Sequence, residues 1–92
     1  MSDKSAIWNH FNLLKLQIRA ARSAVGSLTS RQRQVLHGLL EGGSNKQIAR
    51  DLGISPRTVE IHRRSLMERL EARTTADAIR IAVYAGLSVD GP

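Results

Sequence analysis

Residues 44–70 read SNKQIARDLGISPRTVEIHRRSLMERL, and the fold of the whole chain is decided in this stretch. It contains two helical patterns, separated by a short turn that includes Gly53. Ser44 and Ser55 stand just before the two patterns, where a serine hydroxyl can accept a hydrogen bond from a free N–H of the first turn. Pro56 follows at a first helical position, where its missing N–H costs nothing. Helices joined by so short a turn cross at a steep angle, so the stretch predicts a helix-turn-helix.

The rest of the chain also has helical spacing, and nothing in it alternates as a strand does. Thr29 followed by Gln32, and Ser44 followed by Gln47, predict capping boxes at two helix starts. We therefore expect an all-α fold. The predicted helices span about 4–24, 30–41, 45–52, 55–70 and 75–86.

A joint at Gly26 divides the chain into an N-terminal amphipathic helix (1–26) and a four-helix domain (27–92). On the first helix, apolar residues recur at alternating spacings of four and three, the heptad seam of a coiled coil. The seam is marginal in length for a coiled coil by itself. Three roles stay open: it forms a dimer contact, docks on its own domain or binds another protein. Its residues are Ile7, Phe11, Leu14 and Ile18, continued by Ala21 and Val25.

The last predicted helix is apolar almost all round, and such a helix is covered on more than one side. One side is the domain's own core. The other is covered by a second copy of the chain, or by the N-terminal helix. The residues predicted for a dimer interface on this helix are Ala78, Ile81, Ala82 and Ala85.

The helix over 55–70 has two distinct faces at 100° per residue. The predicted core face holds Val59, His62, Leu66 and Leu70, and the outward face holds Arg57, Glu60, Ile61, Arg64 and Glu68.

The outward residue types suit the major groove of DNA. An arginine can donate two hydrogen bonds to guanine, a carboxylate can accept from the cytosine amino group, and an aliphatic tip can contact a thymine methyl. The alternative is a solvated surface, because Glu60 and Arg64 are four apart and could form an intrahelical pair.

Composition favours a polyanionic partner without proving one. The chain of 92 residues has 14 Lys plus Arg against 8 Asp plus Glu, a formal charge of +6. It has no cysteine, which excludes disulfides and thiolate metal sites. No apolar run is long enough for a membrane span, and no signal peptide is found, so we expect a cytoplasmic, nucleoid-associated protein.

No sequence pattern indicates an enzyme. No nucleophile motif, phosphate-binding glycine loop or credible carboxylate pair is found. His10, His37 and His62 have no partners at metal-ligand spacing, and His62 is interpreted as a structural histidine at the edge of the core. We expect neither a metal nor a cofactor.

Many residues in register resemble the LuxR-type (GerE-like) helix-turn-helix family over about 28–87. The stretch 54–60 is especially similar to the FixJ and NarL branch of response-regulator output domains. The matching residues are Leu28, Thr29, Arg31, Val35, Leu36, Gly43, Ser44, Asn45, Lys46, Ile48, Ala49, Leu52, Ile54, Ser55, Thr58, Val59, His62 and Leu70. Two positions depart from the family: Gln32 stands where Glu is usual, and Glu60 where many relatives have Lys.

The resemblance implies residue roles. The positions of Glu60, Ile61 and Arg64 match those that reach base edges. Lys46 and Thr58 have simpler alternatives, as a solvated lysine and a capping hydroxyl. The residues expected near the DNA backbone are Ser44, Asn45, Lys46, Ser55, Arg57, Thr58, His62, Arg63 and Arg69.

The first functional hypothesis is a stand-alone homodimer that binds a roughly palindromic operator in double-stranded DNA, with RNA polymerase or another regulator as further partners. No receiver or ligand-binding domain is found, although Met1 is compatible with a native start or a truncation. The second hypothesis is a protein-interaction module that sequesters another LuxR-type regulator as a heterodimer. A third, the promoter-recognition region of a sigma factor, is disfavoured by the whole apolar helix after residue 70.

Overall fold

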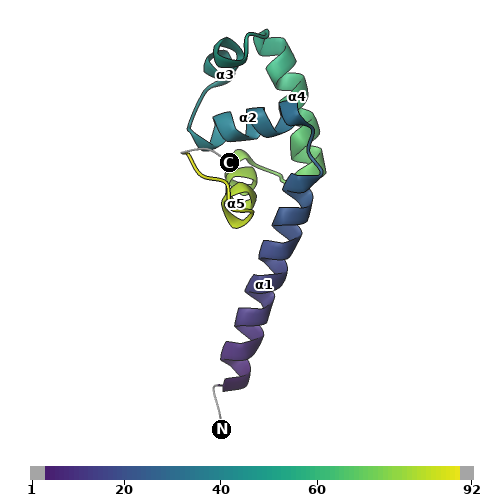
Figure 1. Ribbon diagram of the computed structural model, residues 1–92, viewed down its shortest axis with the longest axis vertical. Coiled ribbons are helices and arrows are strands. Elements are labelled where there is room, and N and C mark those ends of the chain that lie inside the picture. Colours follow the sequence, from purple (N-terminus) through teal and green to yellow (C-terminus); the bar gives the residue numbers. More distant parts are fainter. Residues whose placement is uncertain (1–3, 90–92) are drawn as a thin grey trace.

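The computed structural model describes residues 4–89, and along them the chain forms helices joined by short turns (Figure 1). The predicted all-α class is confirmed. The helices are α1 (Lys4–Gly26), α2 (Ser30–Leu40), α3 (Asn45–Leu52), α4 (Pro56–Leu70) and α5 (Thr75–Tyr84).

Four of the predicted helix boundaries differ from the structure by one to two residues, and one of them is the start of α4 at Pro56. The first helix continues through Gly26 because the Ser27 N–H still donates to the Ser23 carbonyl at 3.1 Å. The second ends at Leu40, one residue early. The last ends at Tyr84 because Gly86 adopts φ 93°, a left-handed conformation that turns the chain away from the helix.

Both predicted capping boxes are present. The Thr29 hydroxyl accepts from the Gln32 N–H at 3.1 Å, and the Gln32 side chain accepts from the Thr29 N–H at 3.0 Å. Ser44 and Gln47 repeat the arrangement at the start of α3. These exchanges satisfy N–H groups that a helix start leaves unpaired, and they fix where α2 and α3 begin.

The core lies where α2, α4 and α5 meet, and α3 closes one end of it. Its largest fully buried side chains are Leu36, Leu66, Val35 and Val59. On α4 the predicted core stripe is confirmed for Val59, Leu66 and Leu70, whereas His62 is only half-buried.

The turn between α3 and α4 depends on Gly53, which has φ 68°. This left-handed conformation is accessible to glycine without the Cβ clash that other residues meet. Just after it, the Ile54 N–H donates to the Ala49 carbonyl at 3.0 Å. The turn therefore stops α3 sharply and sets α4 across it, which is the predicted helix-turn-helix.

α1 extends well beyond the domain, and this gives the molecule extents of 59 × 24 × 19 Å. Figure 1 shows its C-terminal end beside α5 and the end of α4, while its N-terminal part runs away from the other helices. Burial follows this arrangement, because Ala21 and Val25 are buried and Ile7 is 67% exposed. The last turns of α1 therefore belong to the packed domain, and the rest protrudes from it.

Candidate nucleic-acid interface

One face of α4 presents the side chains predicted to contact bases. Glu60, Ile61 and Arg64 are all exposed, and Ile61 is 50% exposed although it is a large aliphatic residue. They lie on the side of α4 opposite to the buried Val59 and Leu66. A guanidinium, a carboxylate and an apolar tip are thus displayed together on one helix.

The exposed ion pair on this face joins Glu60 to Arg57, with 3.5 Å between Oε2 and Nη1. It is not the pair with Arg64 that the spacing allowed. No hydrogen bond or ion pair among residues 4–89 holds the Arg64 guanidinium. Arg57 is 75% exposed, so its contact with Glu60 contributes little to stability and can exchange for another anion.

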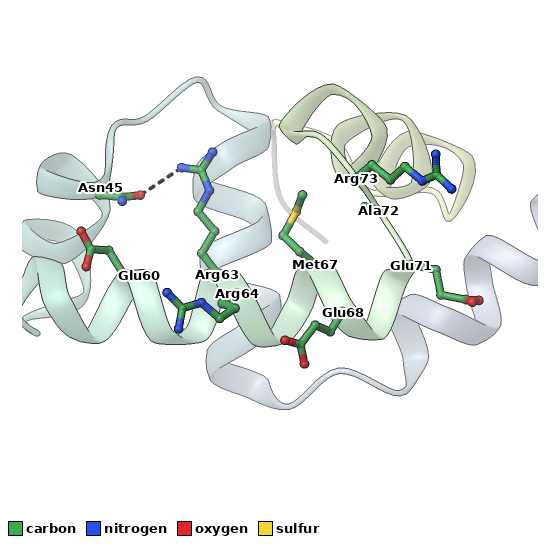
Figure 2. Close-up of a pocket in the computed structure, with 9 residues that line it drawn as sticks. All are labelled: Asn45, Glu60, Arg63, Arg64, Met67, Glu68, Glu71, Ala72 and Arg73. Atoms are coloured by element: carbon green, nitrogen blue, oxygen red, sulfur yellow. Dashed lines mark hydrogen bonds between the residues drawn. The ribbon is translucent and has the colours of Figure 1, made fainter.

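Arg63 lies on a different side of α4 and is engaged inside the protein. Its Nη1 donates to Asn45 Oδ1 at 3.0 Å, and its Nη2 donates to the Thr75 hydroxyl. Figure 2 shows Arg63 reaching toward Asn45, whereas Arg64 extends across α4 toward Glu60 and Glu68 points away from Asn45. Asn45 and Thr75 are the first residues of α3 and α5, so one guanidinium links three helices.

That Arg63 and Asn45 lie near the DNA backbone stays a prediction, and in the free chain the two side chains have partners of their own. Both side chains are only partly exposed and hydrogen-bonded to each other. Sequence reasoning missed the bridge because its three ends are 12 and 18 residues apart, and no local spacing reports such a contact.

Several hydroxyl groups in the predicted backbone set serve as helix caps. Ser55 Oγ accepts from the Thr58 N–H at 3.0 Å and lies 2.8 Å from the Thr58 hydroxyl. Ser44 caps α3 in the same way. Thr58 is the residue whose N–H is capped, and its hydroxyl contacts the Ser55 hydroxyl and no backbone N–H, so a capping role for the Thr58 hydroxyl stays a prediction. Lys46, by contrast, is exposed at the start of α3.

The other two members of the backbone set lie farther along α4. His62 is half-buried. Arg69 is exposed, and its Nη1 donates to the Ser27 carbonyl at 2.6 Å, which ties the last turn of α4 to the joint between α1 and α2. Its role in the free protein is therefore to connect helices.

A groove of about 570 Å³ runs beside the exposed face of α4. Figure 2 shows the side chains around it, which come from α3, from α4 and from the segment after α4. Its lining residues are Asn45, Glu60, Arg63, Arg64, Met67, Glu68, Glu71, Ala72 and Arg73. The groove mixes arginines with carboxylates, so it offers both donors and acceptors. Within residues 4–89 no three His, Cys, Asp or Glu side chains gather as metal ligands would.

The prediction that Ala78 and Ala82 lie in a dimer interface is wrong for the folded chain. Both are 0% exposed, because α5 is packed against α1 and α2 at once. The second cover that an apolar helix requires is thus supplied partly by the end of α1. Ile81 and, just after α5, Ala85 are half-buried, whereas Ala76 and Val83 are exposed, Val83 at 54%.

The dimer residues predicted on α1 are accessible. Ile7, Phe11 and Leu14 are exposed, and Ile18 is half-buried. The continuation of the seam, Ala21 and Val25, packs on the chain's own domain, whereas Ile7, Phe11 and Leu14 do not. No helix in the described part of the chain has the length and apolarity to cross a bilayer.

A helix-turn-helix whose second helix presents a guanidinium, a carboxylate and an aliphatic tip defines the class of domains that place this helix in the major groove. Comparison with known proteins agrees. The family model for bacterial regulatory proteins of the luxR family matches residues 26–82. The chain belongs to this family, and it carries the family's DNA-binding domain.

Two curated relatives show the extent of the similarity. The transcriptional regulatory protein FixJ of Bradyrhizobium diazoefficiens is 46% identical over 66 residues, which cover 72% of this chain and 32% of FixJ. The transcriptional regulatory protein UhpA of Escherichia coli is 40% identical over 65 residues, covering 71% of this chain and 33% of UhpA. The chain thus spans about a third of the length of these relatives.

The fold is also that of a solved relative. The crystal structure of full-length FixJ from B. japonicum superposes with a TM-score of 0.73 at 39% identity, covering 82% of this chain and 37% of that one. The predicted four-helix LuxR-type fold is therefore confirmed.

Proposed function

We propose that this chain binds double-stranded DNA sequence-specifically as a transcriptional regulator, with α4 in the major groove. The observation that carries the proposal is the joint exposure of Glu60, Ile61 and Arg64 on one face of α4. Arg64 suits guanine, because its guanidinium can donate two parallel hydrogen bonds and no group in residues 4–89 occupies it. Ile61 suits a thymine methyl, since an exposed aliphatic tip loses water when it meets one.

Backbone contacts would come from cations at the rim of this face. Lys46 and Arg57 are exposed near the starts of α3 and α4, where the helix N-termini add partial positive charge. With the formal charge of +6, these groups favour phosphate through counterion release. They position the protein on DNA without reading its sequence.

A homodimer on a roughly palindromic operator fits this arrangement. Ala76 and Val83 are exposed, Ile79 is half-buried, and these three lie on the side of α5 opposite to the buried Ala78 and Ala82. A twofold contact there would present two copies of α4 to half-sites about one turn of DNA apart, roughly 34 Å. Ile7 and the other dimer residues predicted on α1 lie on a separate surface, and the charged residues of that helix are all basic.

The alternative function is a module that pairs with another LuxR-type regulator and sequesters it. The exposed apolar side chains of α1 favour a protein partner of some kind. Mixing the chain with a candidate regulator and measuring both association and operator release would discriminate the two functions. A stable homodimer that holds one operator tightly counts against sequestration.

The test of the DNA proposal compares two substitutions on an operator selected from random DNA. Arg64→Ala is expected to weaken operator binding by about 1–3 kcal/mol and to relax specificity at one position. Lys46→Ala is expected to weaken binding to all sequences equally and to flatten the dependence of affinity on salt.

Arg19→Ala provides the matched control, because it removes an exposed cation from α1 and leaves both sets of predicted DNA contacts intact. If Arg64→Ala and Lys46→Ala both bind as the unmodified chain does, the recognition face has been assigned to the wrong side of α4.

A further inference from the structure

α1 concentrates the exposed apolar surface of the described chain. Large hydrophobic side chains that are exposed include Ile7, Trp8, Phe11, Leu13, Leu14 and Leu16, all on this helix. A protruding helix with so much exposed apolar surface usually marks an interaction site.

The α1 seam, defined as Ile7, Phe11, Leu14 and Ile18, lies on the same side of α1 as Ala21 and Val25. Those last two are buried, and α1 packs there against α5 and α4. The C-terminal end of this stripe is therefore already a helix-packing surface. The seam extends the same surface beyond the domain.

The charge beside the seam has a single sign. Between Lys4 and Leu40 the sequence contains no Asp or Glu. On α1, Lys15 lies over the Phe11 ring, with 5.0 Å between Nζ and the ring centroid. Lys15 and Arg22 also line a hollow of about 280 Å³ together with Ile18 and Arg19. The cations thus flank the seam directly.

A second copy does not complement this charge. Flanking positions set partner choice in coiled coils through ion pairs between helices. If two α1 helices paired in parallel, Lys15 would face His10 and Arg22 would face Gln17, since the heptad places these residues at facing flanks. No ion pair could form, because neither helix carries a carboxylate.

We propose that the α1 seam binds an amphipathic helix of a different protein that carries Asp or Glu along the edge facing Lys15 and Arg22. Carboxylates at that edge would pair with the cations and exclude the homotypic complex. A lipid surface also attracts a basic amphipathic helix, so the vesicle measurement below is the outcome that separates it from a helical partner. This inference concerns α1 alone and does not depend on DNA binding.

Trp8 provides the readout, because it is the single tryptophan of the chain, is 63% exposed and lies beside the seam. The probe is a synthetic amphipathic helix with leucine at the seam positions and glutamate at the flanking positions. Its counterpart has lysine in place of glutamate. The full chain is expected to bind the glutamate peptide with a blue shift of Trp8 fluorescence, and the lysine peptide at least about tenfold more weakly.

Two variants with the same change in net charge distinguish a local contact at Lys15 from a general electrostatic attraction between the chain and the peptide. Lys15→Gln removes a cation beside the seam and is expected to weaken glutamate-peptide binding about threefold. Asn9→Asp changes the net charge equally on the side of α1 opposite the seam, and binding is expected to stay unchanged. Both residues are exposed, so thermal unfolding of both variants should match that of the unmodified chain.

Three results would overturn the proposal. The first is equal binding of both peptides, or equal effects of Lys15→Gln and Asn9→Asp. The second is tighter binding to phosphatidylglycerol vesicles than to the glutamate peptide, with the same Trp8 shift. The third is a homodimer in sedimentation that Phe11→Asp dissociates and the glutamate peptide does not. Operator binding by Lys15→Gln should be unaffected, so failure of this proposal is distinct from failure of the DNA-binding proposal.

Discussion

Arg63 and Arg64 are adjacent in sequence and have opposite surroundings. Arg63 donates to Asn45 and Thr75 inside the protein, whereas Arg64 projects from the exposed face of α4. Helical periodicity predicts that neighbours point in directions 100° apart, and this much follows from the sequence. The partners of Arg63 could not be predicted, because they depend on how α3 and α5 pack around α4.

Arg63→Ala tests the assignment of this residue as a bridge. The substitution removes two hydrogen bonds from a charged donor, so it is expected to lower the free energy of unfolding by about 1–3 kcal/mol. Urea denaturation followed by circular dichroism measures this loss. The slope of operator affinity against salt is expected to change little, because the guanidinium is already occupied.

Arg57→Ala is the paired control for that experiment. Arg57 is 75% exposed and weakly paired, so the stability of this variant should stay within about 0.5 kcal/mol. Its salt slope should become shallower if Arg57 contacts phosphate. A stability loss for Arg57→Ala together with a shallower salt slope for Arg63→Ala would show that Arg57 is the structural residue and Arg63 the phosphate contact.

At the scale of elements, the helix boundaries were predictable to within two residues because capping chemistry is local. The hydroxyls of Ser44, Ser55 and Thr29 each accept a hydrogen bond from the N–H three residues ahead, a spacing that a sequence displays directly. The approach of α2 to α3 was not predictable. It depends on Gly38, whose lack of a side chain leaves room for Ile48.

Gly38→Ala is expected to lower the free energy of unfolding by about 1–3 kcal/mol. A Cβ at this position would lie 2.7 Å from Ile48 Cγ1, and Ile48 is only 2% exposed, so it cannot move aside freely. This strain outweighs the gain of about 1 kcal/mol that alanine brings to a helix interior. Thermal or urea unfolding measures the difference.

Gly26→Ala is the matched substitution, because a Cβ there has no atom within 4 Å and Gly26 is also helical. Its stability is expected to equal or exceed that of the unmodified chain. Equal losses at Gly26 and Gly38 would contradict the role assigned to close packing between α2 and α3.

At the scale of the whole molecule, the compact domain buries or half-buries most of its large apolar side chains, whereas the protruding part of α1 exposes them. The heptad spacing of Ile7 to Ile18 was visible in sequence, but the spacing does not tell whether a seam is covered by its own domain. In the structure the seam on α1 is not covered by the domain at Ile7, Phe11 and Leu14, and it is half-buried at Ile18. For α5 the structure reassigns Ala78 and Ala82 to the core, because the apolar pattern alone could not say which neighbour covers them.

Removal of residues 1–18 is expected to leave the free energy of unfolding within about 0.5 kcal/mol of that of the full chain. The buried residues of α1 are Ala21 and Val25, so residues 4–18 contribute the half-buried Ile18 but no fully buried side chain. Urea unfolding of the shortened chain checks this. A loss of several kcal/mol would show that α1 docks on the domain in solution.

Val83→Glu tests the proposed α5 contact between copies. Val83 is 54% exposed, so the fold should tolerate the charge, while a twofold contact would bring two carboxylates together. Operator affinity is expected to fall about tenfold or more, with unchanged thermal unfolding. Gln34→Glu lowers the net charge by the same amount at an exposed position of α2 and serves as a control for general changes in charge. Unchanged operator affinity and unchanged oligomeric state for Val83→Glu would place the dimer contact elsewhere.

The hydrogen bond from Arg69 to the Ser27 carbonyl joins the end of α4 to the base of α1. α1 has 23 residues, and at about 1.5 Å per residue such a helix is roughly 34 Å long. Because its C-terminal end is fixed to α4, α1 sets both the distance and the direction of its N-terminal end relative to α4. A partner bound near the N-terminal end of α1 would be held in a fixed direction relative to the proposed recognition face of α4, so it would approach bound DNA in one orientation.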